Sequence, residues 1–198
     1  MRLPAQLLQR KIDSHKGDFG HIFILAGSAR FSGAAVLCAY ATIRSGSGLV
    51  TLGIPKSLNN AIIKIKPKEV MTLPLPETRE STLSISSYKK IKDFAKDIDV
   101  LVVGPGLTKN KSTQALIRKI ISKINKPTII DADGLNALVG HLNLLRVTSY
   151  ELRVTRILTP HPGEMAQLLK ISVDKVQRNR EDVTQRFARD YKATVVLK

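Results

Sequence analysis

Short apolar runs alternate with longer amphipathic stretches along the whole chain. Residues 21–26 form an apolar run bounded by glycines, the pattern of a buried strand, whereas residues 87–98 repeat apolar positions at helical spacing with lysines between them. Read this way, the chain predicts strands at 21–26, 49–54, 70–73, 99–103, 127–130, 156–158 and 194–197. It predicts helices at 33–45, 57–65, 87–98, 113–124, 134–139, 162–169 and 172–191, the last capped at Ser172.

This order predicts an α/β fold in which a mostly parallel central sheet carries helices on both faces, because strands that are apolar on both sides must be covered on both sides. The 198 residues suit one domain that spans 1–198. The run at 194–197 has the composition of a core strand, and such strands normally lead onward into a loop and a helix. We therefore expect a single domain that lacks its C-terminal part.

Composition indicates a soluble globular protein, with 43% apolar and 24% charged residues. The single cysteine, Cys38, lies in an apolar run, where we expect it to be a buried small hydrophobic residue and not a nucleophile. A reducing, cytoplasmic location fits that cysteine content. No apolar run approaches the roughly 20 residues of a membrane span, and we expect no membrane partner.

The chain is strongly basic, with 32 Lys and Arg against 16 Asp and Glu and a formal net charge of +16. The excess is spread along the sequence, and its densest clusters, residues 64–68 and 89–92, have no aromatic residues between the lysines. We therefore do not expect a nucleic-acid partner, although a basic nucleic-acid-binding protein stays open as an alternative. Anionic metabolites are equally compatible with this charge.

Ligands of open parallel sheets bind beyond the carboxyl ends of the strands, so the loops after the predicted strands are the candidate sites. The first such loop runs from Gly27 to Ala35 and consists largely of small residues, which would let backbone amides approach a ligand. The second, Gly104-Pro105-Gly106-Leu107, is a rigid turn with bare backbone. A tight strand-to-helix connection is the alternative for the first loop, and an ordinary turn is the alternative for the second.

Two further loops carry polar side chains. In Asp131-Ala132-Asp133-Gly134-Leu135-Asn136, Asp133 is placed either to cap the next helix or to contact a metal or a hydroxyl group. In Thr159-Pro160-His161-Pro162-Gly163-Glu164, two prolines stiffen a loop that presents an imidazole and a carboxylate, which favours a functional site over a structural histidine.

Several common motifs are missing from the sequence. Neither GxxxxGK[ST] nor GxGxxG occurs, which argues against both of the nucleotide-binding folds that those motifs mark. HExxH and CxxC are absent too, and the other histidines have no metal-ligand spacing, so a zinc site is not expected.

Taken together and in order, these segments resemble the ADP- or ATP-dependent NAD(P)H-hydrate dehydratases of the ribokinase-like superfamily. The resemblance rests on His15-Lys16-Gly17, Leu25-Ala26-Gly27-Ser28, Ser32-Gly33-Ala34-Ala35, Arg44-Ser45-Gly46-Ser47-Gly48, Gly104 to Leu107, Asp131 to Asn136, Thr159 to Glu164 and Val195 to Lys198. It spans nearly the whole chain, and the combination of the three loops at Gly104 to Leu107, Asp131 to Asn136 and Thr159 to Glu164 is specific.

The resemblance implies repair of the S epimers of NADH hydrate and NADPH hydrate. The added ring hydroxyl would be phosphorylated by ADP or ATP with Mg²⁺, and phosphate would then be eliminated. It implies substrate contacts at Ala34 or Ala35, Gly104, Gly106 and His161, with Asp133 and Asn136 lining the same crevice, a nucleotide contact at Lys198, and a contact of Glu164 with Mg²⁺ through water. A homo-oligomer is a further, weaker implication.

The family's catalytic Asp belongs to a Gly-Thr/Ser-Gly-Asp motif that would follow Lys198, so no catalytic residue of that kind lies within 1–198. We therefore expect this polypeptide alone to be nearly inactive. A related small-molecule kinase of cofactor biosynthesis remains an alternative, although such kinases tend to carry Asn at the position of His161.

Overall fold

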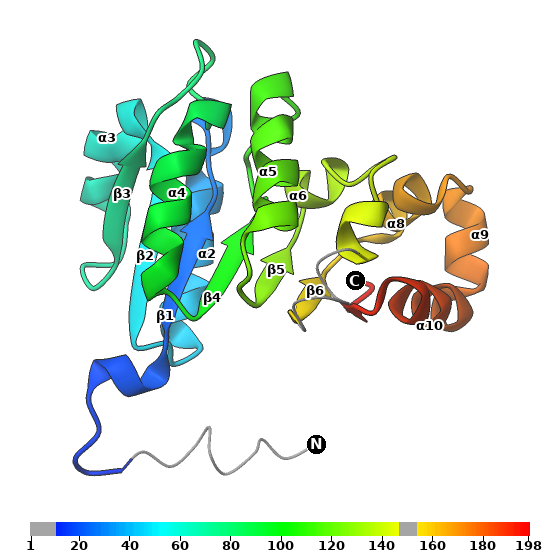
Figure 1. Cartoon of the computed structure of the whole chain (residues 1–198), viewed down its shortest axis with the longest axis horizontal. Helices are drawn as coiled ribbons and strands as arrows, with labels where there is room; N and C mark the ends of the chain where they lie inside the picture. The colour runs from blue at the N-terminus through cyan, green and yellow to red at the C-terminus, as the bar shows by residue number, and fades with distance from the viewer. Residues whose placement is uncertain (1–10, 147–153) are drawn as a thin grey trace.

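Seven parallel strands form one continuous sheet. The computed structural model describes residues 11–146 and 154–198, and within them the strand order is β3-β2-β1-β4-β5-β6-β7, with every pairing parallel. The strands are β1 (His21–Leu25), β2 (Leu49–Pro55), β3 (Met71–Leu75), β4 (Val100–Val103), β5 (Thr128–Ile130), β6 (Arg156–Leu158) and β7 (Thr194–Val195). The predicted parallel sheet is confirmed (Figure 1).

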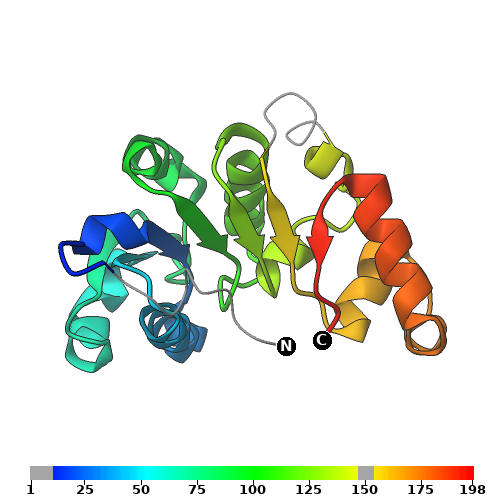
Figure 2. The same ribbon diagram turned by 90° about the horizontal axis from the view of Figure 1, so that it is seen from below.

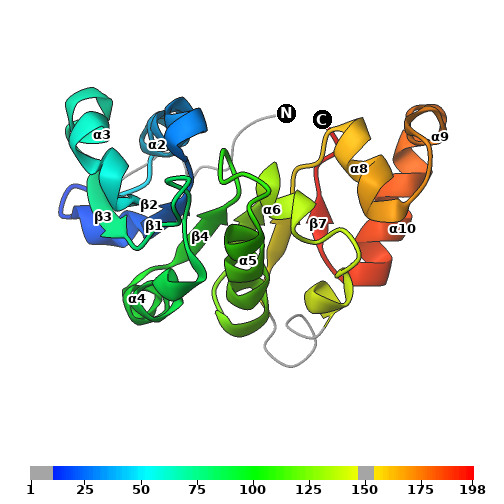
Figure 3. The ribbon, with the colours of Figure 1, turned by 90° about the horizontal axis from the view of Figure 1, so that it is seen from above.

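Helices cover both faces of this sheet. They are α2 (Ser32–Arg44), α3 (Asn59–Ile65), α4 (Tyr88–Phe94), α5 (Lys111–Lys123), α6 (Asp133–Asn136), α8 (Pro162–Leu169), α9 (Val173–Arg178) and α10 (Arg180–Tyr191). Figure 3 shows α2 and α3 on one side of the sheet and α4 and α5 on the other, and Figure 2 gives the same division from the opposite direction. The α/β fold with three layers is therefore confirmed.

The two faces of the sheet form two hydrophobic clusters, because successive side chains of a strand point to opposite faces. Phe23 and Leu25 of β1 belong to the larger cluster, and Ile24 belongs to the smaller one. In the smaller cluster, Ala35 and Ala39 of α2 are completely buried, and their short side chains let this helix lie close to the sheet.

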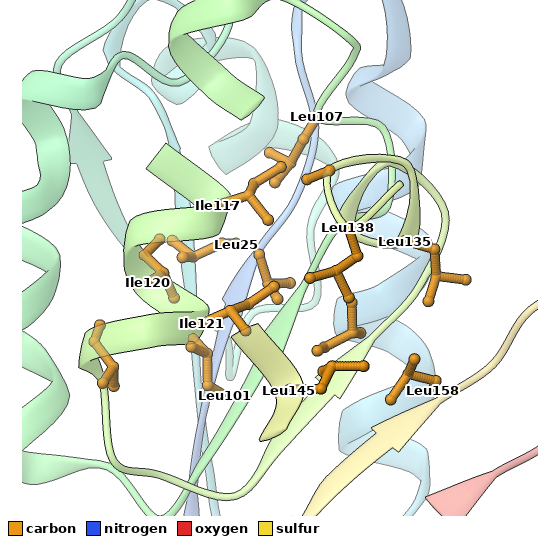
Figure 4. Close-up of a cluster of buried hydrophobic side chains, with 14 of the residues drawn as sticks. Leu25, Leu101, Leu107, Ile117, Ile120, Ile121, Leu135, Leu138, Leu145 and Leu158 are labelled. Carbon is orange, nitrogen blue, oxygen red and sulfur yellow. The ribbon is translucent and has the colours of Figure 1, made fainter. Parts of the chain in front are cut away.

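The larger cluster is centred on α5. Figure 4 shows Ile117, Ile120 and Ile121 of this helix gathered with Leu25 and Leu101 from the sheet. All five side chains are at most 1% exposed. Full burial of one such side chain contributes roughly 1.5–3 kcal/mol, so this cluster holds the central strands and their carboxyl-end loops in a fixed arrangement.

The edge strand β3 is longer than predicted. The sequence places a strand at 70–73 and a loop around Pro74, but β3 continues through Leu75, and Pro74 pairs with Ile54 of β2. Proline is compatible with this position because β3 lies at the edge of the sheet, where the side of the strand that faces away from β2 needs no amide donor.

The single helix predicted at 172–191 is wrong. Asn179 has φ −132° and ψ 40°, which interrupts the helical backbone between α9 and α10. Asparagine is a poor helix former, and the break lets Val176 on one side and Val183 and Phe187 on the other all reach the core. The predicted cap at Ser172 is confirmed, since its hydroxyl accepts a hydrogen bond from Lys175 N at 3.2 Å.

Other helices are shorter or tighter than predicted. The segments 57–65 and 87–98 each combine an α-helix with a 3₁₀ turn, Lys56–Leu58 and Ala95–Asp97 respectively. The helix predicted at 134–139 is only the single turn of α6, and the strand predicted at 194–197 is the two-residue β7. The same topology results, because the errors concern boundaries and not the type of element.

A buried arginine joins the amino ends of the last strands to the end of α5. Arg156 is 1% exposed, and its guanidinium donates to the carbonyl oxygens of Ile121, Ile124 and Lys126 and to the Thr128 hydroxyl, at 2.7–3.3 Å. Burial lowers the pKa of Arg156 to about 10. A cation at the C-terminal end of a helix is favourable, so the role of Arg156 is structural.

No helix within residues 11–146 and 154–198 is long and apolar enough to cross a membrane.

Candidate functional site

The predicted site loops meet at the carboxyl edge of the sheet. The loops after β1 and β4 are joined by a hydrogen bond from Gly27 N to Pro105 O at 2.8 Å. Gly106 has φ +69°, and a Cβ placed on it would lie 2.8 Å from the Ala34 Cβ. The structure thus brings Ala34 and Gly106 together, whereas Ala35 is completely buried in the core.

The loops after β4 and β5 are in still closer contact. Gly104 has φ +133°, and a Cβ built on it would lie 1.8 Å from Asp131 O and 2.7 Å from Gly134 N. Glycine is therefore required here for both conformational and steric reasons. The Gly-Pro-Gly turn lies with its backbone directly against the Asp131–Gly134 segment.

Asp133 does not cap α6 as one interpretation of the sequence suggested. The N-cap residue is Ala132, with no capping side chain, and Asp133 instead accepts from Thr108 N at 2.8 Å through Oδ2 and from Asn136 Nδ2 at 3.0 Å through Oδ1. Gln114 Nε2 adds bonds to the carbonyl oxygens of Thr108 and Asp133 at 3.1 and 3.3 Å. These bonds fix the loop after β4 to the start of α6.

The loops after β5, β6 and β7 are joined through one carboxylate. Asp131 Oδ1 accepts from Thr159 Oγ1 and from Lys198 Nζ, both at 2.8 Å, and Lys198 N donates to Pro160 O at 2.9 Å. The Asp131 side chain is 28% exposed and that of Lys198 46%. The predicted nucleotide-contacting lysine therefore lies beside the third and fourth loops.

His161 and Glu164 form a capping box at the start of α8. His161 Nδ1 accepts from Gly163 N at 3.0 Å and from Glu164 N at 3.3 Å, and Glu164 Oε2 accepts from His161 N at 2.8 Å. These hydrogen bonds satisfy amides at the helix start, so both residues have a structural role. The imidazole is nevertheless 56% exposed, with its Nε2 3.5 Å from Glu164 Oε1.

Three non-glycine residues with positive φ lie on the same edge, and two more, Lys170 and Lys192, end α8 and α10. Ser81, Thr108 and Ala132 have positive φ angles of 51°, 72° and 49°, and they follow β3, β4 and β5 respectively. Such conformations cost about 1–3 kcal/mol each for residues other than glycine, and they are frequent at ligand sites. The strained positions at Ser81 and Thr108 carry no sequence signal.

Cys38 is half-buried and not fully buried as the sequence suggested. Burial, and to a smaller extent the negative charge of Asp131, raises the pKa of the Cys38 thiol. The thiol is therefore held protonated, which agrees with the expectation that it is not a nucleophile.

Metal-ligand groups are sparse. In the part of the chain that the structure describes, no cluster of three or more His, Cys, Asp or Glu side chains could hold a metal ion. Glu164 is a single, mostly buried carboxylate, with Oε2 engaged by His161 N and Oε1 3.5 Å from His161 Nε2. Both oxygens of the Glu164 carboxylate therefore face His161.

The parallel sheet with helices on both faces is an α/β fold of the ribokinase-like kind, as a structural match shows. A ribokinase-like superfamily protein from Enterococcus faecalis superposes with a TM-score of 0.75 at 21% identity, over 99% of this chain and 65% of that one. The profile of the NAD(P)H-hydrate dehydratase family matches residues 22–198, and the chain belongs to that family.

Relatives within the family are similar in sequence over the whole chain. The bifunctional NAD(P)H-hydrate repair enzyme Nnr of Moorella thermoacetica is 36% identical over 98% of this chain, and that of Escherichia coli is 32% identical over 100%. The chain spans 36% and 34% of their respective lengths. The ADP/ATP-dependent NAD(P)H-hydrate dehydratase of Bacillus subtilis, co-crystallised with ATP and Mg²⁺, has a TM-score of 0.73 at 26% identity, over 96% of this chain and 61% of that one.

Proposed function

We propose that this protein restores NADH or NADPH from the S epimer of the corresponding hydrate, with ADP or ATP as the phosphoryl donor. The observation that carries the proposal is the continuous contact of the loops after β1, β4, β5 and β6 along one edge of the sheet. Family membership supplies the substrate class, because this fold by itself hosts many activities.

The proposed chemistry replaces a poor leaving group by a good one. Transfer of a phosphoryl group to the ring hydroxyl converts departing hydroxide into departing phosphate, whose negative charge is spread over several oxygens. The ring nitrogen supplies the electron pair as the carbon–oxygen bond breaks and phosphate leaves, and loss of a proton from the adjacent ring carbon then restores the carbon–carbon double bond of the reduced ring. Bound Mg²⁺ would neutralise charge on the transferred phosphoryl group.

The joined first and second loops are the proposed position of the planar end of the substrate. We place the hydrated nicotinamide ring at the edge formed by Ala34, Gly104 and Gly106, where the two glycines let the neighbouring loops pack closely and so set the shape of the site. Because His161 Nδ1 accepts two amide hydrogens, the nitrogen left to donate is Nε2, which would turn from Glu164 Oε1, 3.5 Å away, to the substrate. Asp133 and Asn136 support these contacts by holding the second loop in place.

The phosphoryl donor is placed on the side of β7. Lys198 Nζ can contact an anionic phosphate group, for which it would leave or share its bond to Asp131. Glu164 would orient Mg²⁺ through water from the first turn of α8. The basic surface favours encounter with both anionic nucleotides.

The test is a turnover assay with the S epimer of NADH hydrate, ADP and Mg²⁺, in which regained NADH absorbance and released phosphate are both followed. We expect residues 1–198 alone to turn over slowly, and a polypeptide continued by the family's Gly-Thr/Ser-Gly-Asp segment to release one phosphate per NADH formed. A small-molecule kinase would instead leave the phosphate on its product. Absence of NADH formation by the continued polypeptide would refute the proposal.

A further inference from the structure

Arg180 is the first residue of α10, and its guanidinium contacts the segment that follows β7. Figures 2 and 3 show β7 beside α10. Arg180 Nη2 donates to Leu197 O at 3.2 Å and to Lys198 O at 2.8 Å, over 17 and 18 positions of sequence. Nη1 donates to Gln177 Oε1 at 3.0 Å, which holds the guanidinium from the side of α9. One arginine therefore joins the start of α10 to the end of the last strand.

This contact begins at the break between α9 and α10. Asn179 has φ −132° and ψ 40°, so Arg180 starts a new helix instead of continuing the old one. Arg180 is half-buried, whereas the other basic residues of these two helices are exposed, namely Lys175, Arg178, Arg186 and Arg189. Burial of a guanidinium costs free energy unless its donors find acceptors, and here two of the acceptors are backbone oxygens after β7.

Lys198 is held by the sheet on one side and by Arg180 on the other. Lys198 N donates to Pro160 O at 2.9 Å, and Lys198 Nζ donates to Asp131 Oδ1 at 2.8 Å. Strand β7 has only two residues and pairs with β6 alone among the described strands. Within residues 11–146 and 154–198, the carbonyl oxygens of residues 197 and 198 accept hydrogen bonds from Arg180 only. Without Arg180 this short strand end would be held on one side, and such ends fray readily.

We infer that Arg180 is a positioning residue for the phosphoryl donor, because it fixes the backbone that carries Lys198. The inference rests on the proposed function, in which Lys198 Nζ contacts a phosphate group of the donor. A lysine that occupies its contacting position for only a fraction of the time weakens the apparent affinity in proportion to that fraction. Loss of Arg180 can therefore cost no more affinity than loss of the Lys198 amino group itself.

Calorimetric titration of the 198-residue chain with ADP and Mg²⁺ tests this inference. Lys198→Ala should weaken ADP binding about tenfold, the worth of one charge-assisted hydrogen bond. Arg180→Ala should weaken it severalfold, and by no more than Lys198→Ala does. In the double variant the loss should equal that of Lys198→Ala alone, because Arg180 acts through that lysine. Arg180→Lys, which keeps the charge but not the fork of donors, should recover part of the affinity.

The matched control is Arg178→Ala. The Arg178 guanidinium is exposed and pairs with Asp174 of α9 at 3.1 Å, so this variant removes the same charge close to Arg180 without a contact to the end of β7. The ADP affinity of the control should equal that of wild type. An equal loss in Arg178→Ala and Arg180→Ala would show that ADP responds to charge in general, and it would overturn the inference.

Acylation of lysine amines, followed by mass spectrometry, reports on the position of Lys198 without any nucleotide. Lys198 Nζ should be acylated faster in Arg180→Ala than in wild type, because the backbone of Lys198 is then held on one side only. The exposed amine of Lys175 should keep its rate and serves as the internal reference. An arginine that merely supports the start of α10 would lower the melting temperature and leave the Lys198 rate unchanged.

Two results overturn the inference. They are additive losses of ADP affinity in the double variant and an unchanged acylation rate of Lys198 in Arg180→Ala. Failure of the proposed function gives different results. If Lys198→Ala binds ADP as tightly as wild type, the placement of the donor beside β7 is wrong, and the nucleotide role of Arg180 is wrong with it. If ADP affinity depends on Arg180 and Lys198 as expected but the continued polypeptide forms no NADH, only the proposed reaction is wrong.

Discussion

Replacement of Gly104 by alanine should separate the loops on which the site depends. The new methyl carbon would lie 1.8 Å from Asp131 O and 2.7 Å from Gly134 N, and both of these are backbone atoms that cannot rotate away. At φ +133° the substitution also places a side chain in a backbone region that favours glycine. The Asp131–Gly134 segment must therefore move away from the end of β4.

The expected loss of stability combines two terms. Backbone strain costs about 1–3 kcal/mol, and displacement of the segment breaks the bonds from Asp131 N to Val103 O and from Thr108 N to Asp133 Oδ2, at about 1 kcal/mol each. A total near 4 kcal/mol lowers the melting temperature by about 8–16 °C in a domain of this size.

Gly140→Ala is the matched control. Gly140 also has a positive φ, +76°, but a Cβ on it would meet nothing within 4 Å, so only the strain remains, about 1–2 kcal/mol. Thermal unfolding followed by circular dichroism compares the two variants. If Gly104→Ala were no less stable than Gly140→Ala, the direct packing of the two loops would be wrong.

Three further predictions concern single groups. A double-mutant cycle with Asp131→Ala and Lys198→Ala, measured by thermal unfolding, should give a coupling free energy below about 1 kcal/mol that weakens with added salt, because the ion pair is half-exposed. A larger coupling that does not depend on salt would contradict this. Arg156→Met should lower the free energy of unfolding in urea by about 3 kcal/mol or more, because it leaves buried carbonyl oxygens without their donor. An unchanged free energy of unfolding would show that the guanidinium is not buried as described. Because its pKa is raised, the Cys38 thiol should be alkylated by iodoacetamide more slowly in the folded chain than in urea, at a pH near the ordinary thiol pKa. This difference in rate should shrink as the pH rises through the raised pKa. Equal rates at every pH would refute the shift.

The hydrophobic pattern was sufficient for the sheet because each core strand is a short apolar run between polar or glycine-containing loops, and parallel strands bring their carboxyl ends to one edge. It failed at Asn179 and Pro74. At Asn179 the break in the helix depends on how α9 and α10 pack on the core, and at Pro74 the length of the strand depends on its position at the edge of the sheet. Local periodicity contains neither kind of information.

Side-chain partners at the site were harder to predict. Asp133 bonds to Thr108 N, 25 positions away, and the spacing of residues along the chain contains no trace of that contact. The capping box of His161 and Glu164 could have been found, since an N-cap residue followed by proline and then a glutamate at the third helical position is a local signal. The contact of Arg180 with the carbonyl oxygens of Leu197 and Lys198 had no such signal.

Hydrogen–deuterium exchange of the 198-residue chain with and without NADPH tests the central claim most directly. If the strand-end loops form one binding edge, added NADPH should slow exchange in segments 27–35, 104–110 and 159–164 together, and should leave α9 and α10 unchanged. Protection absent from these three segments, or confined to α9 and α10, would contradict the account.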